Sequence, residues 1–190
     1  MALEIERKFL LRNDNWRSQV TGSVHYRQAY LNQETDCSVR VRVSGDQAWL
    51  NLKGVTMGAA RLEFEYEIPV SDAHDMLNQL SKTPVVEKQR YFVRQGSHTW
   101  EIDVFEGENA GLVVAEIELD SVDEYFDRPD WLGVEVTRDV RYYNTHLARH
   151  PFSQWETSAI APESPVPSSR PASPVQPIDV IAPASSASAL

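Results

Sequence analysis

The sequence predicts a mainly β fold with few helices. Eight separate segments of the first 120 residues alternate apolar with polar side chains at a period of two, which is the pattern of half-buried strands. Short turn-forming stretches between these segments favour antiparallel neighbours. Only one segment shows clear helical spacing. At 190 residues, the chain fits one globular domain of residues 1–156 followed by a tail.

The expected strands follow one another closely along the chain. The segment Ser44-Gly45-Asp46 predicts a tight hairpin between the third and fourth strands, because glycine readily adopts the left-handed backbone of such turns. A further short alternation sets Val134 and Val136 against polar neighbours. The eight strands are expected at residues 3–11, 24–31, 38–43, 47–53, 61–69, 85–94, 98–105 and 112–120.

One clear helix is expected between the fifth and sixth strands. Ser71 is predicted to cap the helix N-terminus, and Pro84 lies beyond the helix end. A weaker helical pattern covers residues 140–149. The apolar residues that share one face of the clear helix are Ala73, Met76, Leu77 and Leu80.

The second face of almost every expected strand carries charged side chains. In residues 3–11, Glu4, Glu6 and Lys8 alternate with a mostly apolar face. The third strand sets three valines against Arg40 and Arg42. The same alternation places further charged residues on second faces, namely Lys53, Arg61, Glu63, Glu65, Glu67, Lys88, Arg90, Glu101, Asp103, Glu116 and Glu118.

Two architectures explain this alternation equally well. In a two-sheet sandwich, the apolar faces meet and the charged faces look toward solvent. In a closed barrel with a polar interior, the charges point inward and the apolar faces are covered from outside. The abundance of arginine and glutamate, which suit fixed multidentate contacts, favours the barrel. The alternation alone leaves both architectures open.

An enclosed set of such charges would need ligands. Packed like charges repel one another, and clustered carboxylates protonate or capture a metal ion. A polyphosphate anion would satisfy the cations, and Mg²⁺ or Mn²⁺ on carboxylate oxygens would bridge protein and phosphate. The cations that would line the barrel interior are Lys8, Arg40, Arg42, Lys53, Arg61, Lys88 and Arg90.

Composition and motifs argue against several other classes of protein. A net charge of −10 argues against nucleic acid as a partner, and no apolar run is long enough to span a membrane. Neither a G-x-x-x-x-G-K-[ST] nor a G-x-G-x-x-G loop is present, so side chains must hold the phosphates. The single Cys37 and the charged N-terminus favour the cytoplasm. Residues 157–190 hold 7 of the 11 prolines and are expected to be disordered.

The order of the charged motifs carries a family resemblance. The opening Glu4-Ile5-Glu6-Arg7-Lys8 resembles the E-x-E-x-K signature of the CYTH domain, also called the triphosphate tunnel metalloenzymes. The resemblance covers about residues 1–148 and leaves the tail unexplained. The later segments that match the family pattern are Gln28-Ala29-Tyr30-Leu31, Val39-Arg40-Val41-Arg42, Leu52-Lys53-Gly54, Glu63-Phe64-Glu65-Tyr66-Glu67-Ile68-Pro69, Lys88-Gln89-Arg90-Tyr91, Trp100-Glu101-Ile102-Asp103, Ala115-Glu116-Ile117-Glu118 and Trp131-Leu132-Gly133.

The resemblance implies a closed eight-stranded antiparallel β-barrel, which forms a hydrophilic tunnel and carries a few external helices. It implies Lys8 and Tyr30 as catalytic residues, with Tyr30 near the attacking water. The metal ligands that it implies for Mg²⁺ or Mn²⁺ are Glu4, Glu6, Glu116 and Glu118, with Asp103 as a further ligand. The phosphate chain is expected on Lys8, Arg40, Arg42, Lys53, Lys88 and Arg90.

Within the family, the chain looks most like the small bacterial triphosphatases. The expected reaction is therefore metal-dependent hydrolysis of tripolyphosphate to pyrophosphate and phosphate. A class IV adenylate cyclase and a thiamine triphosphatase are alternatives that share the phosphate grip. A non-catalytic polyphosphate- or nucleotide-binding module and a structural sandwich without a small ligand are alternatives from other classes. The resemblance also suggests a homodimer, because dimers are common among relatives.

Overall fold

The computed structural model describes residues 3–32, 36–55 and 60–156. The tail of residues 157–190, expected to be disordered, lies outside the described residues. The eight expected strands are all present in the expected order, with their ends shifted by a few residues. The strands in the described part of the chain are β1 (Leu3–Leu11), β2 (Val20–Tyr30), β3 (Cys37–Ser44), β4 (Gln47–Gly54), β5 (Ala60–Glu67), β6 (Val86–Gln95), β7 (His98–Phe105), β8 (Val113–Glu118) and β9 (Leu132–Glu135).

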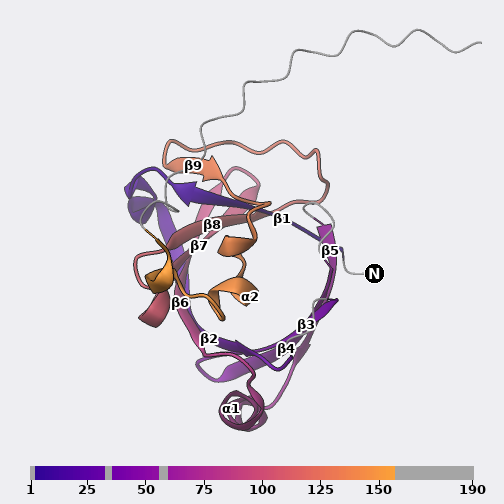
Figure 1. Cartoon of the computed structure of the whole chain (residues 1–190). Coiled ribbons are helices and arrows are strands. Elements are labelled where there is room, and N and C mark those ends of the chain that lie inside the picture. The colour runs from indigo at the N-terminus through magenta and orange to yellow at the C-terminus, as the bar shows by residue number, and fades with distance from the viewer. Residues whose placement is uncertain (1–2, 33–35, 56–59, 157–190) are drawn as a thin grey trace, which may run out of the picture.

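The first eight strands close into an antiparallel ring (Figure 1). The order around the ring is β5, β4, β3, β2, β6, β7, β8 and β1, and β1 pairs in turn with β5. Each neighbouring pair in the ring is antiparallel. Because the sheet closes on itself, the barrel prediction is confirmed and the sandwich is wrong.

β1 is the strand at which the ring closes. One edge of β1 pairs with β8 over residues 6–10, and the other edge is shared between β5 and the short strand β9. The sequence pattern indicated β9 only as a brief alternation. Gly133 allows this pairing, because a Cβ atom there would lie 2.7 Å from the carbonyl oxygen of Leu10.

Tight turns join the paired strands where the sequence predicts them. Ser44 pairs with Gln47 across the β3–β4 hairpin, and Gly45 in its turn has φ of 57°. Gly96 has φ of 60° in the β6–β7 turn. Positive φ in two-residue turns matches the twist of the flanking strands.

The helix before β6 differs from its prediction at both ends. It runs as α1 (Val70–Asp75) and continues as a π-helical turn, η2 (Met76–Leu80). Pro69, not Ser71, occupies the N-cap position, and the Ser71 hydroxyl donates to the Asp72 side chain instead. Leu80 was expected on the buried face but is 54% exposed, because the wider π-helical turn changes the spacing of side chains.

The C-terminal segment has a position that the sequence did not predict. It forms a 3-10 turn, η4 (Val140–Tyr142), and a short helix, α2 (Asn144–Leu147). Figure 1 shows α2 within the outline of the ring. Leu147 is buried in a cluster with Val86 and Val114, which continue the inward faces of β6 and β8. The segment therefore closes part of one end of the barrel.

The main apolar core lies on the outer face of β1, β7 and β8. Trp100 is fully buried there and packs edge-on against Trp131, with ring centroids 5.4 Å apart. The helix α1 covers β3 and β4 with Ala73 and Leu77. The other short helices are η1 (Asn15–Gln19), η3 (Gly107–Asn109) and η5 (Phe152–Gln154). With the core outside, the ring interior is left to polar residues. Within the described ranges, no helix has the length and apolarity needed to cross a membrane.

Candidate active site

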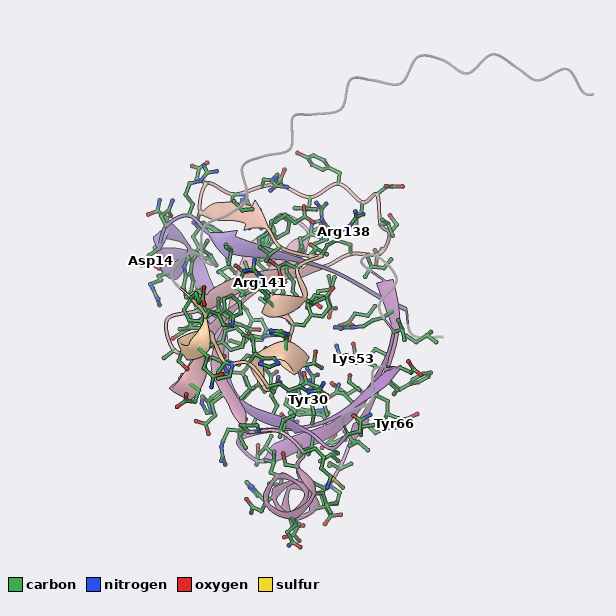
Figure 2. The ribbon with its side chains drawn as sticks, viewed as in Figure 1. Asp14, Tyr30, Lys53, Tyr66, Arg138 and Arg141 are labelled. Atoms are coloured by element: carbon green, nitrogen blue, oxygen red, sulfur yellow. The ribbon has the colours of Figure 1, made fainter. Side chains whose placement is uncertain are left out.

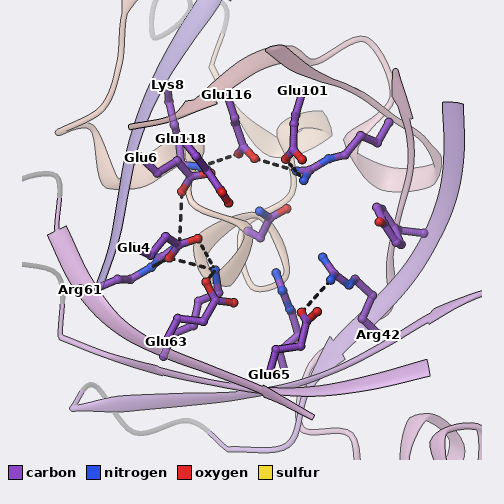
Figure 3. A pocket seen from close by; sticks show the side chains of 15 residues that line it. Glu4, Glu6, Lys8, Arg42, Arg61, Glu63, Glu65, Glu101, Glu116 and Glu118 are labelled. Atoms are coloured by element: carbon purple, nitrogen blue, oxygen red, sulfur yellow. Dashed lines mark hydrogen bonds and ion pairs between the residues drawn. The ribbon is translucent and has the colours of Figure 1, made fainter. Parts of the chain in front are cut away.

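The charged strand faces meet inside the ring, where they line a cavity of about 260 Å³ (Figure 3). Alternate residues of a strand point to one face, and ring closure turns that face inward. We call this cavity the tunnel. Tyr26 and Asn144 also line it. The charged lining residues are Glu4, Glu6, Lys8, Arg40, Arg42, Lys53, Arg61, Glu63, Glu65, Arg90, Glu101, Glu116 and Glu118.

The expected site residues are almost all brought together. Of the expected catalytic, phosphate-binding and metal-binding residues, only Tyr30, Lys88 and Asp103 do not line the tunnel. Figure 2 places Tyr30 and Lys53 on the inner side of the ring. The structure thus confirms that these side chains converge, while their individual roles stay predictions.

Carboxylates crowd together where β1 meets β8. Glu6 is the Cα partner of Glu118, and Lys8 is the partner of Glu116. Burial, reinforced by the charge of Glu116, raises the pKa of Glu6 to about 7. Burial and the charge of Glu101 likewise raise the pKa of Glu118. Carboxylates packed this closely do not all ionise unless additional cations neutralise their charge.

Lys8 is fixed between two of these carboxylates. Its Nζ lies 2.9 Å from a carboxylate oxygen of Glu6 and donates a hydrogen bond to Glu116. Burial opposes the charge of Lys8, but the carboxylates of Glu116 and Glu6 outweigh burial and raise its pKa. The Lys8 ammonium group is therefore charged, and its hydrogen bonds to two lining glutamates fix it in the tunnel.

Glu4 forms the centre of a second charged group. Lys53 Nζ donates to Glu4 at 2.8 Å and lies 3.0 Å from Glu63. Arg61 bridges the two groups, because it donates to Glu4 and, at 3.2 Å, to Glu6. Burial alone would raise the pKa of Glu4, but the charges of Lys53 and Arg61 lower it overall. Glu4 thus stays ionised at neutral pH.

Asp103 and Lys88 lie behind the tunnel wall. Asp103 is fully buried, and Arg90 donates to both of its oxygens at 2.7 Å. Lys88 also bonds Asp103, and burial together with the charge of Arg90 lowers the pKa of Lys88 to about 8. Arg90 in turn reaches Glu116 at 2.7 Å in the tunnel. This arrangement fixes the guanidinium of Arg90 from behind.

Arg40 differs from the other cations of the interior. It is 7% exposed, and no ion pair joins it to a carboxylate in the ranges that the structure describes. Its Nε atom is buried without a hydrogen-bond partner there. The guanidinium hydrogen-bonds with Tyr30, whose pKa burial raises. Arg40 therefore has donors available for an anion.

Arg42 lies against two aromatic rings. Its guanidinium carbon lies 4.6 Å from the ring centroid of Tyr26 and 5.3 Å from that of Trp49, and these two rings also meet edge-on. Its Nη2 donates to Glu65 at 2.8 Å. The two cation–π contacts and this ion pair restrict the planar guanidinium.

Sequence reasoning did not identify Tyr26 and Asn144 as lining residues. Tyr26 lies two and four residues before Gln28 and Tyr30 on the same strand, so the period of two contains the signal that identifies it. Asn144 lies on α2, for which the sequence indicated only a weaker helical pattern without a position relative to the barrel. No local pattern indicates that this helix reaches the tunnel.

Tyr30 lines a second cavity, of about 390 Å³, which adjoins the tunnel. Lys53 and Arg61 line both cavities, and the second one is completed by residues of the α2 region such as Tyr143, which follows η4. We call it the chamber. Tyr30 thus lies at the boundary between the tunnel and the chamber.

The tunnel has the donors for a divalent cation without a preformed cage. Among the described residues, no three His, Cys, Asp or Glu side chains are grouped as a metal site. Lys8 bonds one oxygen each of Glu6 and Glu116, and Arg61 and Arg90 bond their other oxygens. All-oxygen ligands are those that Mg²⁺ and Mn²⁺ prefer. The donor set therefore fits such a cation if the carboxylates exchange these partners for the metal ion.

Comparison with known proteins agrees with this site. The model of the CYTH domain matches residues 2–150. The chain belongs to the CYTH domain family. A relative of this CYTH domain in Acetivibrio thermocellus, named inorganic triphosphatase, is 47% identical over 156 residues, which are 82% of this chain and 99% of the relative. A Nitrosomonas europaea protein of the same name is 37% identical over 149 residues, covering 76% and 96%.

Solved structures share the fold of this CYTH domain. The crystal structure of an inorganic triphosphatase has 35% sequence identity and a TM-score of 0.56, covering 78% of this chain and 95% of that one. A protein from Pyrococcus horikoshii has 19% identity and a TM-score of 0.52, covering 63% and 80%. At that identity the likeness concerns the fold alone.

Proposed function

We propose that this CYTH domain hydrolyses inorganic tripolyphosphate to pyrophosphate and orthophosphate inside the tunnel. The observation that carries the proposal is Arg40, a buried cation with no carboxylate partner in the described part of a tunnel whose other cations are paired. A buried charge without a counter-ion is costly, so this wall is suited to an anionic ligand. The name inorganic triphosphatase, carried by two relatives, supports the same substrate.

The tunnel cations would hold the phosphate chain by charge-assisted hydrogen bonds. Arginine suits this role because its planar donors bind phosphate oxygens in pairs. Lys88 and Asp103 would act from behind the wall by orienting Arg90. The residues proposed to contact phosphate directly are Lys8, Arg40, Arg42, Lys53 and Arg90.

The proposed ligands for Mg²⁺ or Mn²⁺ are Glu4, Glu6, Glu116 and Glu118. Asp103 was expected as a further ligand, but both of its oxygens are engaged by Arg90 and Lys88. It would join the ligand set only by exchanging those partners. A bound divalent cation neutralises phosphate charge and lowers the pKa of water.

In the reaction, a water oxygen bonds to the terminal phosphorus, and the bond from that phosphorus to its bridging oxygen breaks. Pyrophosphate leaves with the electron pair of the broken bond, and the water proton passes to solvent. Lys8 would donate hydrogen bonds to the oxygens on which charge accumulates. Tyr30, which burial keeps protonated, would orient the water rather than act as a base.

A substrate panel tests the proposal. The full chain is incubated with tripolyphosphate, ATP or thiamine triphosphate, with Mg²⁺, Mn²⁺ or excess chelator, while orthophosphate, pyrophosphate and cyclic AMP are measured. We expect orthophosphate and pyrophosphate from tripolyphosphate with metal and no turnover with chelator. Apart from Tyr26 and Asn144, the residues that line the tunnel are charged, so it offers a nucleobase little apolar surface. Efficient cyclic AMP formation would instead assign a cyclase.

The substitution Glu116→Gln distinguishes hydrolysis from simple binding. Glutamine keeps the size of the side chain and removes the charge that a metal ion needs. We expect turnover of tripolyphosphate to fall by at least about 100-fold while the chain still binds tripolyphosphate. A wild-type chain that binds tripolyphosphate without turnover, with the same binding in Glu116→Gln and Glu4→Gln, would favour a non-catalytic binding module.

A further inference from the structure

The chamber is a cationic cavity in an acidic protein. The positive groups that line it are Lys53, Arg61 and Arg149, and the imidazole rings of His146 and His150 add hydrogen-bonding nitrogens. Its described lining contains no aspartate or glutamate. The tunnel, in contrast, is lined by seven glutamates, and the whole chain has a net charge of −10. A cavity of one sign attracts and concentrates anions.

The contacts within the chamber agree with this positive potential. The rings of His146 and His150 lie with centroids 4.9 Å apart. Burial and the charge of His150 lower the pKa of His146, with Arg141 and Arg149 acting in the same direction and Asp139 opposing them. Arg149 is exposed and forms no ion pair with any residue in the described ranges. Its guanidinium is therefore available to a ligand.

The position of the chamber relates it to the reaction. Tyr30 lines the chamber and also lies within the electrostatic influence of Arg40, Arg61 and Lys8 from the tunnel. Of the proposed catalytic pair, Lys8 thus lines the tunnel and Tyr30 lines the chamber, and the two cavities share Lys53 and Arg61. A phosphoryl group that is cut off there has the chamber directly beside it. Its volume of about 390 Å³ holds a hydrated orthophosphate ion.

We propose that the chamber is a second oxyanion site, which takes up the orthophosphate released at the Tyr30 end of the tunnel. Arg149 would bind the ion together with His146, and Lys53 and Arg61 would pass it across the shared wall. The assignment of the ion as a product rests on the proposed function, whereas the anion site itself rests on the chamber lining.

Titration of the metal-free full chain with orthophosphate tests the site without any turnover. We expect Arg149→Gln to weaken orthophosphate binding by about tenfold, because it removes a charge-assisted contact. His146→Gln should weaken binding in the same direction. Arg94→Gln is the matched control, since Arg94 is an exposed arginine of β6 that lines neither cavity. This control should keep the affinity of the wild-type chain.

A second variant separates the chamber from the tunnel. Arg42 lines the tunnel only, so Arg42→Gln should weaken orthophosphate binding less than Arg149→Gln does. Binding that falls in Arg42→Gln but not in Arg149→Gln would place the ion in the tunnel and overturn the proposal. Absence of orthophosphate binding in the wild-type chain would overturn it as well.

Product inhibition connects the site to catalysis. We expect orthophosphate to inhibit tripolyphosphate hydrolysis, and Arg149→Gln to require about tenfold more orthophosphate for the same inhibition. Unchanged inhibition in this variant would contradict the role of the chamber in product release. A substrate panel without phosphate release would overturn the proposed function, whereas the titration alone decides whether the anion site exists.

Discussion

The backbone amide of Lys8 donates a 3.0 Å hydrogen bond to the side-chain hydroxyl of Thr137. No strand pairs with this edge of β1 at Lys8, because β5 pairs with residues 3–5 and β9 pairs further along. The amide of Val136 donates to the carbonyl of Lys8 at 2.8 Å. The segment after β9 therefore takes the place of a neighbouring strand. It fixes the backbone from which the Lys8 side chain enters the tunnel.

Replacing Thr137 with valine should loosen this attachment. Valine has a similar shape but leaves the buried amide of Lys8 without an acceptor, which costs about 1–3 kcal/mol of unfolding free energy. Urea denaturation measures the loss, and kcat should fall because the Lys8 ammonium is less well placed. Thr137→Ser keeps the hydroxyl and should retain most of both. A valine variant as stable and as active as the wild-type chain would contradict this role.

The rings around Arg42 should determine how well the tunnel binds substrate. Trp49→Leu removes one of the two cation–π contacts, worth about 0.5–2 kcal/mol, so KM for tripolyphosphate should rise by roughly three- to tenfold. The value of kcat should stay unchanged, because Arg42 is proposed to bind the phosphate chain of the substrate away from the bond that breaks. Trp49→Phe restores a ring and should recover most of the affinity. A fall in kcat at constant KM would contradict this positioning role.

An ion pair outside the ring should make stability depend on pH. Arg7 Nε donates to Glu135 at 2.8 Å. Burial alone would raise the pKa of Glu135, but hydrogen bonds from Arg7 and Thr137 lower it below its ordinary value of 4.5. A carboxylate whose pKa is lower in the folded state adds stability above its unfolded pKa and loses it as pH falls through the folded value.

The substitution Glu135→Gln tests this dependence. The variant should melt at a lower temperature than the wild-type chain at pH 7. The difference should shrink as pH falls below the ordinary carboxyl value of 4.5 and through the lower folded pKa of Glu135, where the wild-type carboxylate becomes protonated as well. Melting curves across the acidic range measure it. A difference that stays constant over the whole acidic range in which the wild-type chain is folded would show that the ion pair does not contribute the pH dependence.

Local periodicity predicted most of the barrel because ring closure preserves it. Alternate residues such as Glu4, Glu6 and Lys8 share a face whatever the neighbouring strands are, so the tunnel lining was visible in the sequence. The chain therefore shows which side chains share a face. The choice between barrel and sandwich needed the family resemblance, because closure depends on the distant pairing of β1 with β5.

The remaining features depend on contacts between distant segments. The position of β9 follows from the close approach of Gly133 to Leu10, and that of α2 from the burial of Leu147 beside Val86. The pairing of charges also depends on register. Arg40 is the cation that lacks a carboxylate partner among the described residues. This can be seen only when the register of all the strands is known. Sequence reasoning thus found most of the side chains that line the tunnel but not their partners.

Lys8 and a divalent cation should compete for the same carboxylates. The Lys8 ammonium lies 2.9 Å from Glu6 and also bonds Glu116, two of the proposed metal ligands. Lys8→Met keeps much of the side-chain volume and removes the charge between them. We expect this variant to bind Mn²⁺ about tenfold more tightly, as measured by calorimetry. Its turnover of tripolyphosphate should fall by more than about 100-fold, because a donor to the transferring phosphate is lost.

Thermal melting provides a readout of the same competition that does not depend on activity. Without metal, Lys8→Met removes the cation between two buried carboxylates and leaves each with a single arginine partner, so the variant should melt below the wild-type chain. Mn²⁺ should then raise the melting temperature of the variant more than that of the wild-type chain, because it binds the folded variant more tightly. Arg7→Met is the matched control, since Arg7 points to the outer face of β1 and pairs with Glu135. Weaker Mn²⁺ binding in Lys8→Met would mean that the ammonium supports the metal site instead of competing with it.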